Sequence, residues 1–228
     1  MTYIFNTPSY KRLQSHLMQI YLALKTNPKK ILEIGIGAKI VSSTLKYYCE
    51  VITADIDKSL KPDFILDISN SKDFNQFNDN SFDLIIICEV LEHVPYTNLD
   101  SILKSLRRIT KKYVVISVPN QKNIYKLTLF RRGYDNKIFA PYIKFLNLFI
   151  KIINRFGTVL ADIHYRMKKK NRKFKFDGEH YWELGIENYT IEKFSNQIQK
   201  YFKVIMQGRL RENFYHHFFL LKKRVSII

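Results

Sequence analysis

The sequence predicts an α/β protein with a doubly wound, mostly parallel sheet of seven strands, a C-terminal antiparallel hairpin and a basic helical insertion after strand five. The first observation is a series of five short apolar runs, each suited to one buried strand, at 31–34, 51–54, 64–66, 84–88 and 114–118. Helical patterns separate several of these runs, and strands alternating with helices form parallel βαβ units. Two later runs, 203–210 and 215–222, are joined by a short polar link, as in a hairpin.

Helical periodicity places helices around this sheet. Apolar residues recur from Leu13 to Leu24, and Asn27 with Pro28 ends the pattern. Similar patterns cover 41–48, 98–108 and 190–201. A chain of 228 residues is long enough to form one domain with a buried core and an insertion. The expected organisation is a ligand-binding core with its N-terminal helix at 1–120, a basic insertion or cap at 121–188, and a helix and hairpin at 189–228 that complete the sheet.

The net charge of +18 is concentrated after the predicted core. Residues 1–120 hold 15 Lys and Arg against 12 Asp and Glu, whereas residues 121–175 hold 15 against 2. Such a segment attracts anionic partners, although lysine enrichment from an AT-biased genome explains it equally well. Within it, residues 142–156 form an amphipathic pattern with a basic stripe, which suits a cap on the core or, as the alternative, contact with a membrane surface.

The two cysteines and the N-terminal residues bear on compartment and metal content. Cys49 and Cys88 lack the spacing of metal ligands, so no zinc site is expected. So few cysteines in a chain of this size indicate a reducing compartment. Neither a signal sequence nor a membrane-spanning run is present, and the sequence therefore predicts a cytoplasmic protein.

Two glycines and an acid indicate a nucleoside site. Gly35 and Gly37 follow the first predicted strand, where glycine lets the backbone approach a ligand. The dinucleotide pattern would need a third glycine at the position of Ile40, which argues against NAD. Asp55 ends the second strand, from which an acid can accept hydrogen bonds from a ribose diol. Asp57 and Asp83 are interpreted as structural acids at strand ends.

Five segments in order resemble the motifs of class I S-adenosylmethionine-dependent methyltransferases: ILEIGIG, VITADID, PDFILDISN, FDLIIICEVLEHVP and KKYVVISVPN, within residues 29–120. The resemblance implies a Rossmann-like fold with S-adenosyl-L-methionine as cofactor. It further implies that Glu33, Gly35 and Gly37 contact the methionine part, Asp55 and Ile56 belong to the ribose side, Asp67 and Ile68 border the adenine, and Cys88 and Glu89 flank the sulfonium. Lys39 replaces a glycine common in the family, which implies a stiffer loop and a cation near the cofactor's carboxylate.

Proton acceptors for the transfer occur in two segments. CEVLEHVP, at the carboxyl end of the fourth strand, offers Glu92 and His93, although such a segment can merely shape the cofactor pocket. FDGEHYWELG offers His180 in a stretch without periodicity, where Tyr181 and Trp182 serve equally well as packing residues. The hypothesis is that Glu92, His93 and His180 act on the acceptor, and that the two histidines approach the same side of the crevice.

Three functions are compatible with these features. The first is methylation of an oxygen, with nitrogen as the alternative, of a small anionic or glycan-linked acceptor, and no resident metal is expected. The acceptor is suggested by DGEHYWELG with ENFYHHFFLLKK, which resembles methyltransferases of surface-polysaccharide gene clusters. The second is RNA methylation, since Glu89, Glu92 and His93 are similar to the magnesium motif of small-RNA terminal 2′-O-methyltransferases, with His180 as a further ligand. The third is a non-catalytic module whose basic segment holds nucleic acid or an anionic membrane, against which the glycine loop and Asp55 argue.

Overall fold

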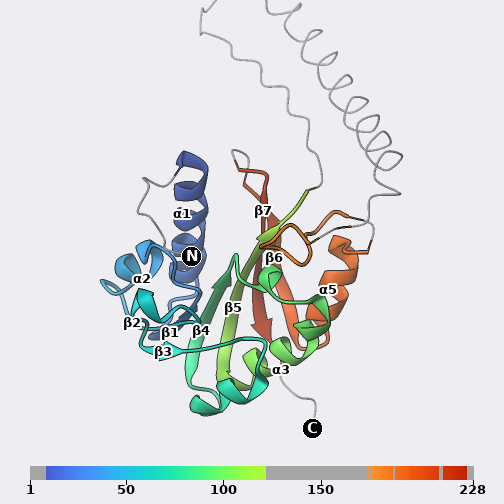
Figure 1. Ribbon diagram of the computed structural model, residues 1–228. Coiled ribbons are helices and arrows are strands. Elements are labelled where there is room, and N and C mark those ends of the chain that lie inside the picture. Colours follow the sequence, from blue (N-terminus) through green and yellow to red (C-terminus); the bar gives the residue numbers. More distant parts are fainter. Residues whose placement is uncertain (1–8, 122–173, 175, 187, 211–212, 225–228) are drawn as a thin grey trace, which may run out of the picture. The chain divides into compact units, whose positions relative to one another are not determined.

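The computed structural model describes residues 9–121, 174, 176–186, 188–210 and 213–224, which form one α/β unit (Figure 1). Its strands are β1 (Lys30–Ile34), β2 (Glu50–Asp55), β3 (Phe64–Ile65), β4 (Phe82–Cys88), β5 (Thr110–Pro119), β6 (Phe202–Arg209) and β7 (His216–Lys223). These seven strands lie in the order β3-β2-β1-β4-β5-β7-β6. Strands β1 to β5 pair in parallel, and β7 pairs antiparallel with β5 and β6. The predicted mostly parallel sheet with its C-terminal hairpin is confirmed.

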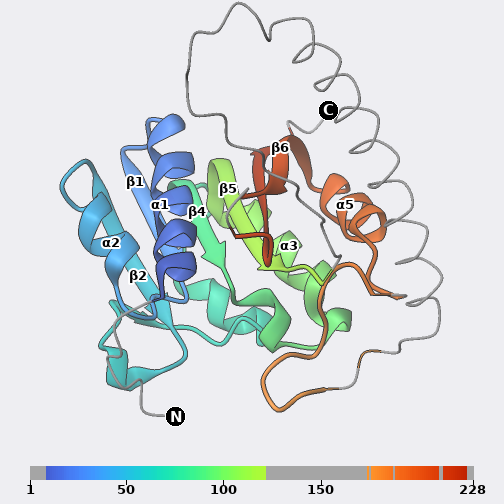
Figure 2. The same cartoon turned by 90° about the horizontal axis from the view of Figure 1, so that it is seen from above.

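Helices cover both faces of the sheet, as Figures 1 and 2 show. On one face lie α1 (Tyr10–Lys25) and α2 (Ile40–Leu45), and on the other α3 (Leu99–Ile109) and α5 (Ile191–Gln199). Because successive strand residues point to opposite faces, β4 contributes Ile85 to the core under α3 and Ile86 to the core under α1. Burial on both faces explains the continuous apolar runs within β1, β4 and β5.

Side-chain caps define where two of the helices begin. The Ser9 Oγ accepts a hydrogen bond from the Arg12 N–H at 3.3 Å, and the Thr190 Oγ1 accepts one from the Lys193 N–H at 3.1 Å. The pattern at 41–48 overstated α2, which ends at Leu45. Tyr47 and Tyr48 are exposed, so these two aromatic residues extended the apolar periodicity without belonging to a buried face.

Short 3₁₀ helices occupy several connections at the sheet ends. They are η1 (Lys58–Leu60), η2 (Ser71–Gln76), η3 (Leu91–His93) and η4 (Tyr96–Asn98). Asp83, at the start of β4, accepts hydrogen bonds from the Lys29 and Lys30 N–H groups, each at 2.9 Å. It therefore orients the turn before β1, in the structural role expected for it. Among the described residues, no helix has the length and apolar character needed to cross a membrane.

Part of the predicted insertion at 121–188 belongs with the sheet. Trp182 and Leu184 are almost fully buried in the core under α3 and α5. The Leu184 N–H donates to the Pro119 carbonyl at 2.9 Å, and the Gln121 N–H donates to the Leu184 carbonyl at 2.9 Å, so this stretch extends the end of β5. The predicted amphipathic helix at 142–156 and most of the basic segment 121–175 lie outside the described residues.

Strand β7 runs in the direction opposite to the parallel strands. Because β7 runs antiparallel to β5, its first residue, His216, lies beside Pro119 at the carboxyl end of the parallel strands. Its later residues return to the other end, where Lys222 lies beside Tyr113. The segment that precedes β7 is thereby delivered to the end of the sheet at which α/β folds bind ligands.

Candidate active site

The candidate site lies at the carboxyl ends of β1, β2 and β4. Strand β1 pairs with β2 on one side and β4 on the other, so chain connections diverge between β1 and β4. A crevice opens at such a switch point in doubly wound sheets. Gly35 follows β1, Asp55 ends β2 and Glu89 follows β4, which brings three of the predicted residues to neighbouring strand ends.

The glycine turn after β1 needs a left-handed backbone. Gly35 has φ +82°, and its N–H donates to the Ala54 carbonyl at 2.9 Å. A Cβ at Gly35 would collide with the Val90 side chain, whereas a Cβ at Gly37 would meet open space. Lys39 has φ +59°, a conformation in which glycine has no steric cost. Lys39, which stands where the related methyltransferases often have a glycine, therefore adopts the left-handed conformation that glycine would adopt without steric cost.

Asp55 is buried and links the glycine turn to the loop after β2. Its Oδ2 accepts from the Ile36 N–H at 2.8 Å, and its Oδ1 accepts from the Asp57 N–H at 2.9 Å. Ile56 is largely exposed. Asp57 accepts from the Ser59 N–H at 2.8 Å and so caps η1, consistent with a structural acid. The backbone donors hold the Asp55 carboxylate at the strand end.

The other residues expected around a cofactor differ in exposure. Asp67 accepts hydrogen bonds from both the N–H and the hydroxyl of Ser69, at 2.8 and 2.7 Å. Ile68 is buried in the core beside η2. Cys88 is buried on the α1 face of the sheet, and burial raises the pKa of its thiol well above the usual range. Its side chain is therefore a packing group rather than a thiolate.

Glu33 carries a buried carboxyl group beneath the glycine turn. The side chain is almost fully buried, and Oε2 has no hydrogen-bond partner among the described residues. Burial raises the pKa of Glu33 to about 7, against an opposing effect of hydrogen bonding with Ser42. An unpartnered buried carboxylate oxygen is suited to a ligand that brings its own hydrogen-bond donor.

Substituting Glu33 by glutamine is expected to stabilise the ligand-free protein at pH 8 and to change little near pH 4.5. The folded protein keeps the proton up to about pH 7, so stability falls as the pH rises from about 4.5 to about 7. The variant lacks this loss, which corresponds to roughly 2–3 kcal/mol. Urea unfolding at both pH values measures it, with the exposed Glu50→Gln as control. An equal difference at both pH values would contradict the assignment.

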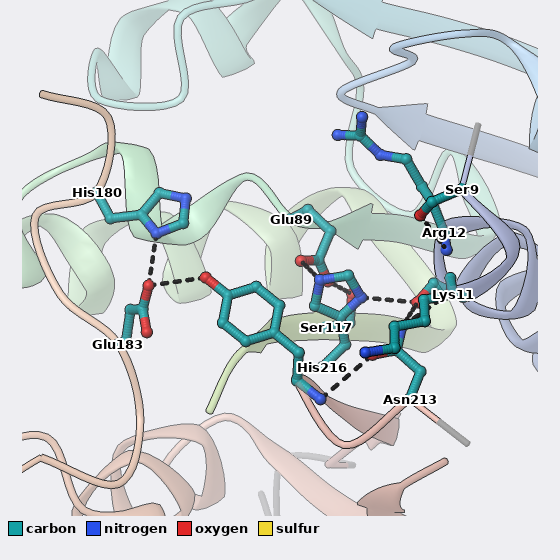
Figure 3. A network of polar contacts seen from close by, with 11 residues as sticks. Ser9, Lys11, Arg12, Glu89, Ser117, His180, Glu183, Asn213 and His216 are labelled. Carbon is teal, nitrogen blue, oxygen red and sulfur yellow. Dashed lines mark hydrogen bonds and ion pairs between the residues drawn. The ribbon is translucent and has the colours of Figure 1, made fainter. Parts of the chain in front are cut away.

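Glu89 is held in a left-handed conformation, with φ +56°, at the carboxyl end of β4. Its carboxylate accepts from the Ser117 hydroxyl through Oε1 and pairs with His216 Nε2 through Oε2, at 2.6 Å for the latter (Figure 3). The other ring nitrogen of His216 lies 2.7 Å from the Ser15 hydroxyl of α1. Both carboxylate oxygens of Glu89 are therefore engaged by protein groups.

His93 and His180 lie next to each other although they are far apart in the sequence. The residue before His180, Glu179, is 86 positions after His93 and contacts it. The ring centroids of the two histidines are 5.0 Å apart. His93 Nδ1 is 3.0 Å from the Glu179 carbonyl oxygen. His180 Nδ1 is 2.8 Å from Glu183 Oε1, which also accepts from the Tyr215 hydroxyl at 2.8 Å (Figure 3). The structure thus brings the two predicted histidines together.

Glu92 precedes His93 in η3 and is almost fully buried. Burial raises the pKa of Glu92 well above its usual range, and the nearby Glu89 and Glu183 carboxylates raise it further. Its Oε2 has no hydrogen-bond partner among the described residues. Glu92, His93 and His180 offer ligand atoms within 4.8 Å of one another, so this group can hold a cation.

The sequence does not assign roles to five further residues of this polar network, of which Figure 3 labels Ser117, Glu183 and His216; the others are Ser15 and Tyr215. Glu183 and the Tyr215-His216 pair stand in segments that had been singled out, WELG and ENFYHH. Their partners depend on the antiparallel pairing of β7, which brings Tyr215 and His216 to the ends of β4 and β5.

Comparison with known proteins identifies the first half of the chain. Residues 32–116 match a family model described as a methyltransferase domain. No curated protein matches the chain. The fold resembles that of the N-methyltransferase NodS from Bradyrhizobium japonicum, in complex with S-adenosyl-L-homocysteine, at 12% identity and TM-score 0.55, over 96% of this chain and 90% of that one.

Two further solved structures share the fold. Magnesium protoporphyrin IX methyltransferase ChlM from Synechocystis PCC 6803, with bound S-adenosyl-L-homocysteine, is 12% identical with TM-score 0.56, over 97% of this chain and 91% of that one. The methyltransferase domain of bacterial CtHen1-C is 15% identical with TM-score 0.55, over 94% and 100%. The family match includes the glycine turn, Asp55 and the residues after β4, and the sheet order agrees with it, so residues 32–116 belong to a methyltransferase domain with the fold of the class I S-adenosylmethionine-dependent enzymes.

Proposed function

We propose that this methyltransferase methylates a hydroxyl oxygen of a small anionic or glycan-linked acceptor in cell-surface polysaccharide synthesis. The observation that carries the proposal is the Tyr215–Glu183–His180 chain beside His93. A carboxylate that binds one nitrogen of an imidazole orients the ring and leaves its other nitrogen to accept a proton. A hydroxyl acceptor requires such a base, whereas a more nucleophilic amine depends on it less.

The residues at the ends of β1, β2 and β4 fit S-adenosylmethionine. Open space beside Gly37 leaves room for close backbone approach, and the unpartnered Glu33 Oε2 suits the ligand's ammonium group. Asp55, fixed by two backbone donors, retains lone pairs for ribose hydroxyls. The rest of the proposed cofactor set is Gly35, Ile56, Asp67, Ile68, Cys88 and Glu89. When bound, the cofactor supplies a methyl group already activated on a sulfonium.

In this proposal His180 removes the proton from the acceptor hydroxyl. The Glu183 carboxylate favours the tautomer with hydrogen on Nδ1, so Nε2 is the accepting atom. His93 packs edge-on against the His180 ring and is itself tied to the Glu179 carbonyl. The Glu92 carbonyl accepts from the Tyr181 N–H at 2.8 Å, which fixes the loop that carries His180. Glu92 therefore contributes to the position of His180 through its backbone carbonyl.

An exposed aromatic pair beside this loop supports a sugar acceptor. The Phe176 and Tyr181 rings are 4.7 Å apart between centroids, and both side chains are exposed. Their flat apolar faces can cover the C–H face of a sugar ring, while polar groups nearby bind its hydroxyls. The described residues of the loop that carries His180 include three acids, Asp177, Glu179 and Glu183. These acids favour binding of a neutral, hydroxyl-bearing part of the acceptor. The anionic character of the acceptor rests on the basic segment 121–175.

We place the reaction in the cytoplasm. Cys49 and Cys88 are both free, as is usual for proteins of a reducing compartment. Peripheral contact with a membrane through residues 142–156 stays a prediction, since these residues lie outside the described part of the chain.

A second candidate is metal-assisted methylation of an RNA 2′-hydroxyl, favoured by the cluster of Glu92, His93 and His180 with ligand atoms within 4.8 Å. The buried, unpartnered Glu92 Oε2 is a natural cation ligand. Two imidazoles suit a transition-metal ion better than magnesium. Glu89, the first acid of the similar motif, has both oxygens engaged by Ser117 and His216, which leaves a set of three.

Methyl transfer from labelled cofactor to fractionated acceptors tests these alternatives. Nucleotide-linked sugars, lipid-linked sugars and short RNA are offered to the wild type and to His180→Ala, with EDTA or with added Mn²⁺ or Mg²⁺. The proposal expects label in a sugar fraction, unaffected by EDTA and lost in the variant. Label that appears only in RNA, and only with metal, supports the second candidate. Label in neither class contradicts both.

A further inference from the structure

A strongly basic groove lies at the opposite end of the sheet from the candidate active site. It has a volume of about 1340 Å³, and its walls come from α3, η2, the start of β5 and the end of β7. Ten of the seventeen residues that line it are lysine or arginine, and one, Asp79, is acidic. Five of these cations lie within 104–112 and three within 222–224, and the fold places these two basic runs side by side.

Several of these cations are held in place by the protein. The Arg108 guanidinium donates to the Phe74 and Phe77 carbonyls, at 2.7 and 2.9 Å, and pairs with Asp79. Lys223 Nζ donates to the Thr110 carbonyl at 2.8 Å and to Asn80 at 2.6 Å. Burial, and next the charge of Arg107, lower the pKa of Lys223, which reflects cations crowded together. Fixed like charges that repel one another favour an anionic ligand.

The shape of the surface favours a linear polyanion. An adjoining groove of about 880 Å³ continues along the edge strand β6 and shares Lys222, Lys223 and Arg224 with the first. The two together form an elongated depression rather than a pocket for one phosphate. A flat bilayer contacts a depression poorly, and the lining includes no exposed large apolar side chain on the α3 side that could enter a membrane.

We propose that this groove binds a single strand of nucleic acid through its phosphates. Arginine forks and lysines neutralise phosphates, and the serine and asparagine side chains of the wall, such as Asn75 and Ser105, supply further donors. The site is separate from the acceptor chemistry, because β5 alone spans ten residues, or about 33 Å, between the two ends of the sheet. The proposal therefore does not depend on which acceptor the enzyme methylates.

Charge reversal within and outside the groove tests the proposal. Lys104→Glu/Lys222→Glu changes two exposed groove lysines, and Lys25→Glu/Lys58→Glu makes the same charge change at exposed residues outside it. Binding of a labelled oligouridylate of about 20 nucleotides is measured by fluorescence anisotropy from about 50 to 300 mM salt. The groove variant should bind at least about tenfold more weakly than the control, and the slope of log K against log salt should fall by about 1.4 or more.

Equal weakening in the two variants overturns the proposal, because the net positive charge alone would then account for binding. Absence of oligonucleotide binding by the wild type also overturns it. A third result also overturns it: the wild type sediments with phosphatidylglycerol vesicles, the groove variant does not, and neither binds the oligonucleotide. The groove would then be a membrane-binding surface. Melting temperatures of both variants, measured in parallel, separate loss of the surface from loss of the fold.

Discussion

Replacing His180 by alanine is expected to lower turnover by about 10²–10⁴-fold while affinity for S-adenosylmethionine stays within about threefold of the wild type. The imidazole lies at the carboxyl end of the sheet, oriented by Glu183, and Tyr215 donates to the same carboxylate oxygen. None of these three groups belongs to the proposed cofactor set. Removing the base therefore lowers the rate of proton removal without disturbing cofactor binding.

Graded variants along the chain of hydrogen bonds sharpen this test. Glu183→Gln keeps an accepting oxygen but removes the charge, and a loss of about 10–100-fold is expected. Tyr215→Phe removes one hydrogen bond to Glu183 and should cost less than about tenfold. For each variant, turnover is measured with the acceptor fraction that the labelling experiment selects, and cofactor affinity is measured by calorimetry. Full turnover in His180→Ala, with the fold intact, would eliminate His180 as the base.

Replacing Asp55 by asparagine is expected to weaken S-adenosylmethionine binding by about 10–150-fold, or roughly 1.5–3 kcal/mol. The carboxylate accepts from the Ile36 N–H through one oxygen and from the Asp57 N–H through the other. An amide cannot accept at both positions, so the variant loses one of these contacts as well as the charge that would face the ribose. Cofactor affinity falls because both the direct contact and the order of the glycine turn are affected.

The neighbouring acid provides a matched control for Asp55. Asp57 is two residues away and accepts from the Ser59 N–H, but it does not contact the glycine turn in any hydrogen bond of the described residues. Asp57→Asn should change cofactor affinity by less than about threefold. Isothermal titration with S-adenosylmethionine and with S-adenosylhomocysteine gives both values. Equal losses in the two variants would remove Asp55 from its proposed role and attribute the effect to net charge.

Local patterns predicted much of the ligand-binding half of the fold. The central parallel strands β1, β4 and β5 are buried on both faces, so each leaves a short apolar run in the sequence. The glycine turn follows the first of these runs directly, and Gly35 lies where a Cβ would collide with Val90. The helical pattern predicted too long an α2, because the exposed Tyr47 and Tyr48 continue the apolar spacing beyond the end of the helix. These features depend on residues that are close together in the sequence, so they can be predicted without knowledge of the tertiary structure.

The acceptor side could be predicted only in part, because its residues meet across long separations. His93 and His180 were singled out by residue type, but their contact depends on the loop at 176–186 packing through Trp182 against the core. Trp182 Nε1 donates to the Val94 carbonyl at 3.0 Å, which draws that loop toward η3. The partners of Glu89, His216 and Ser117, come from strands whose pairing the residue types do not specify.

By itself the sequence determined the parallel strands, the glycine turn after β1 and the place of Asp55 at the end of β2. Only the tertiary structure decided how the C-terminal hairpin connects the two ends of the sheet. Because β7 runs antiparallel to β5, it brings His216 to Glu89 at one end and Lys223 to Thr110 at the other. The basic groove depends on the same pairing, because most of its lysines and arginines lie in two runs, 104–112 and 222–224, that become neighbours only when β7 pairs with β5.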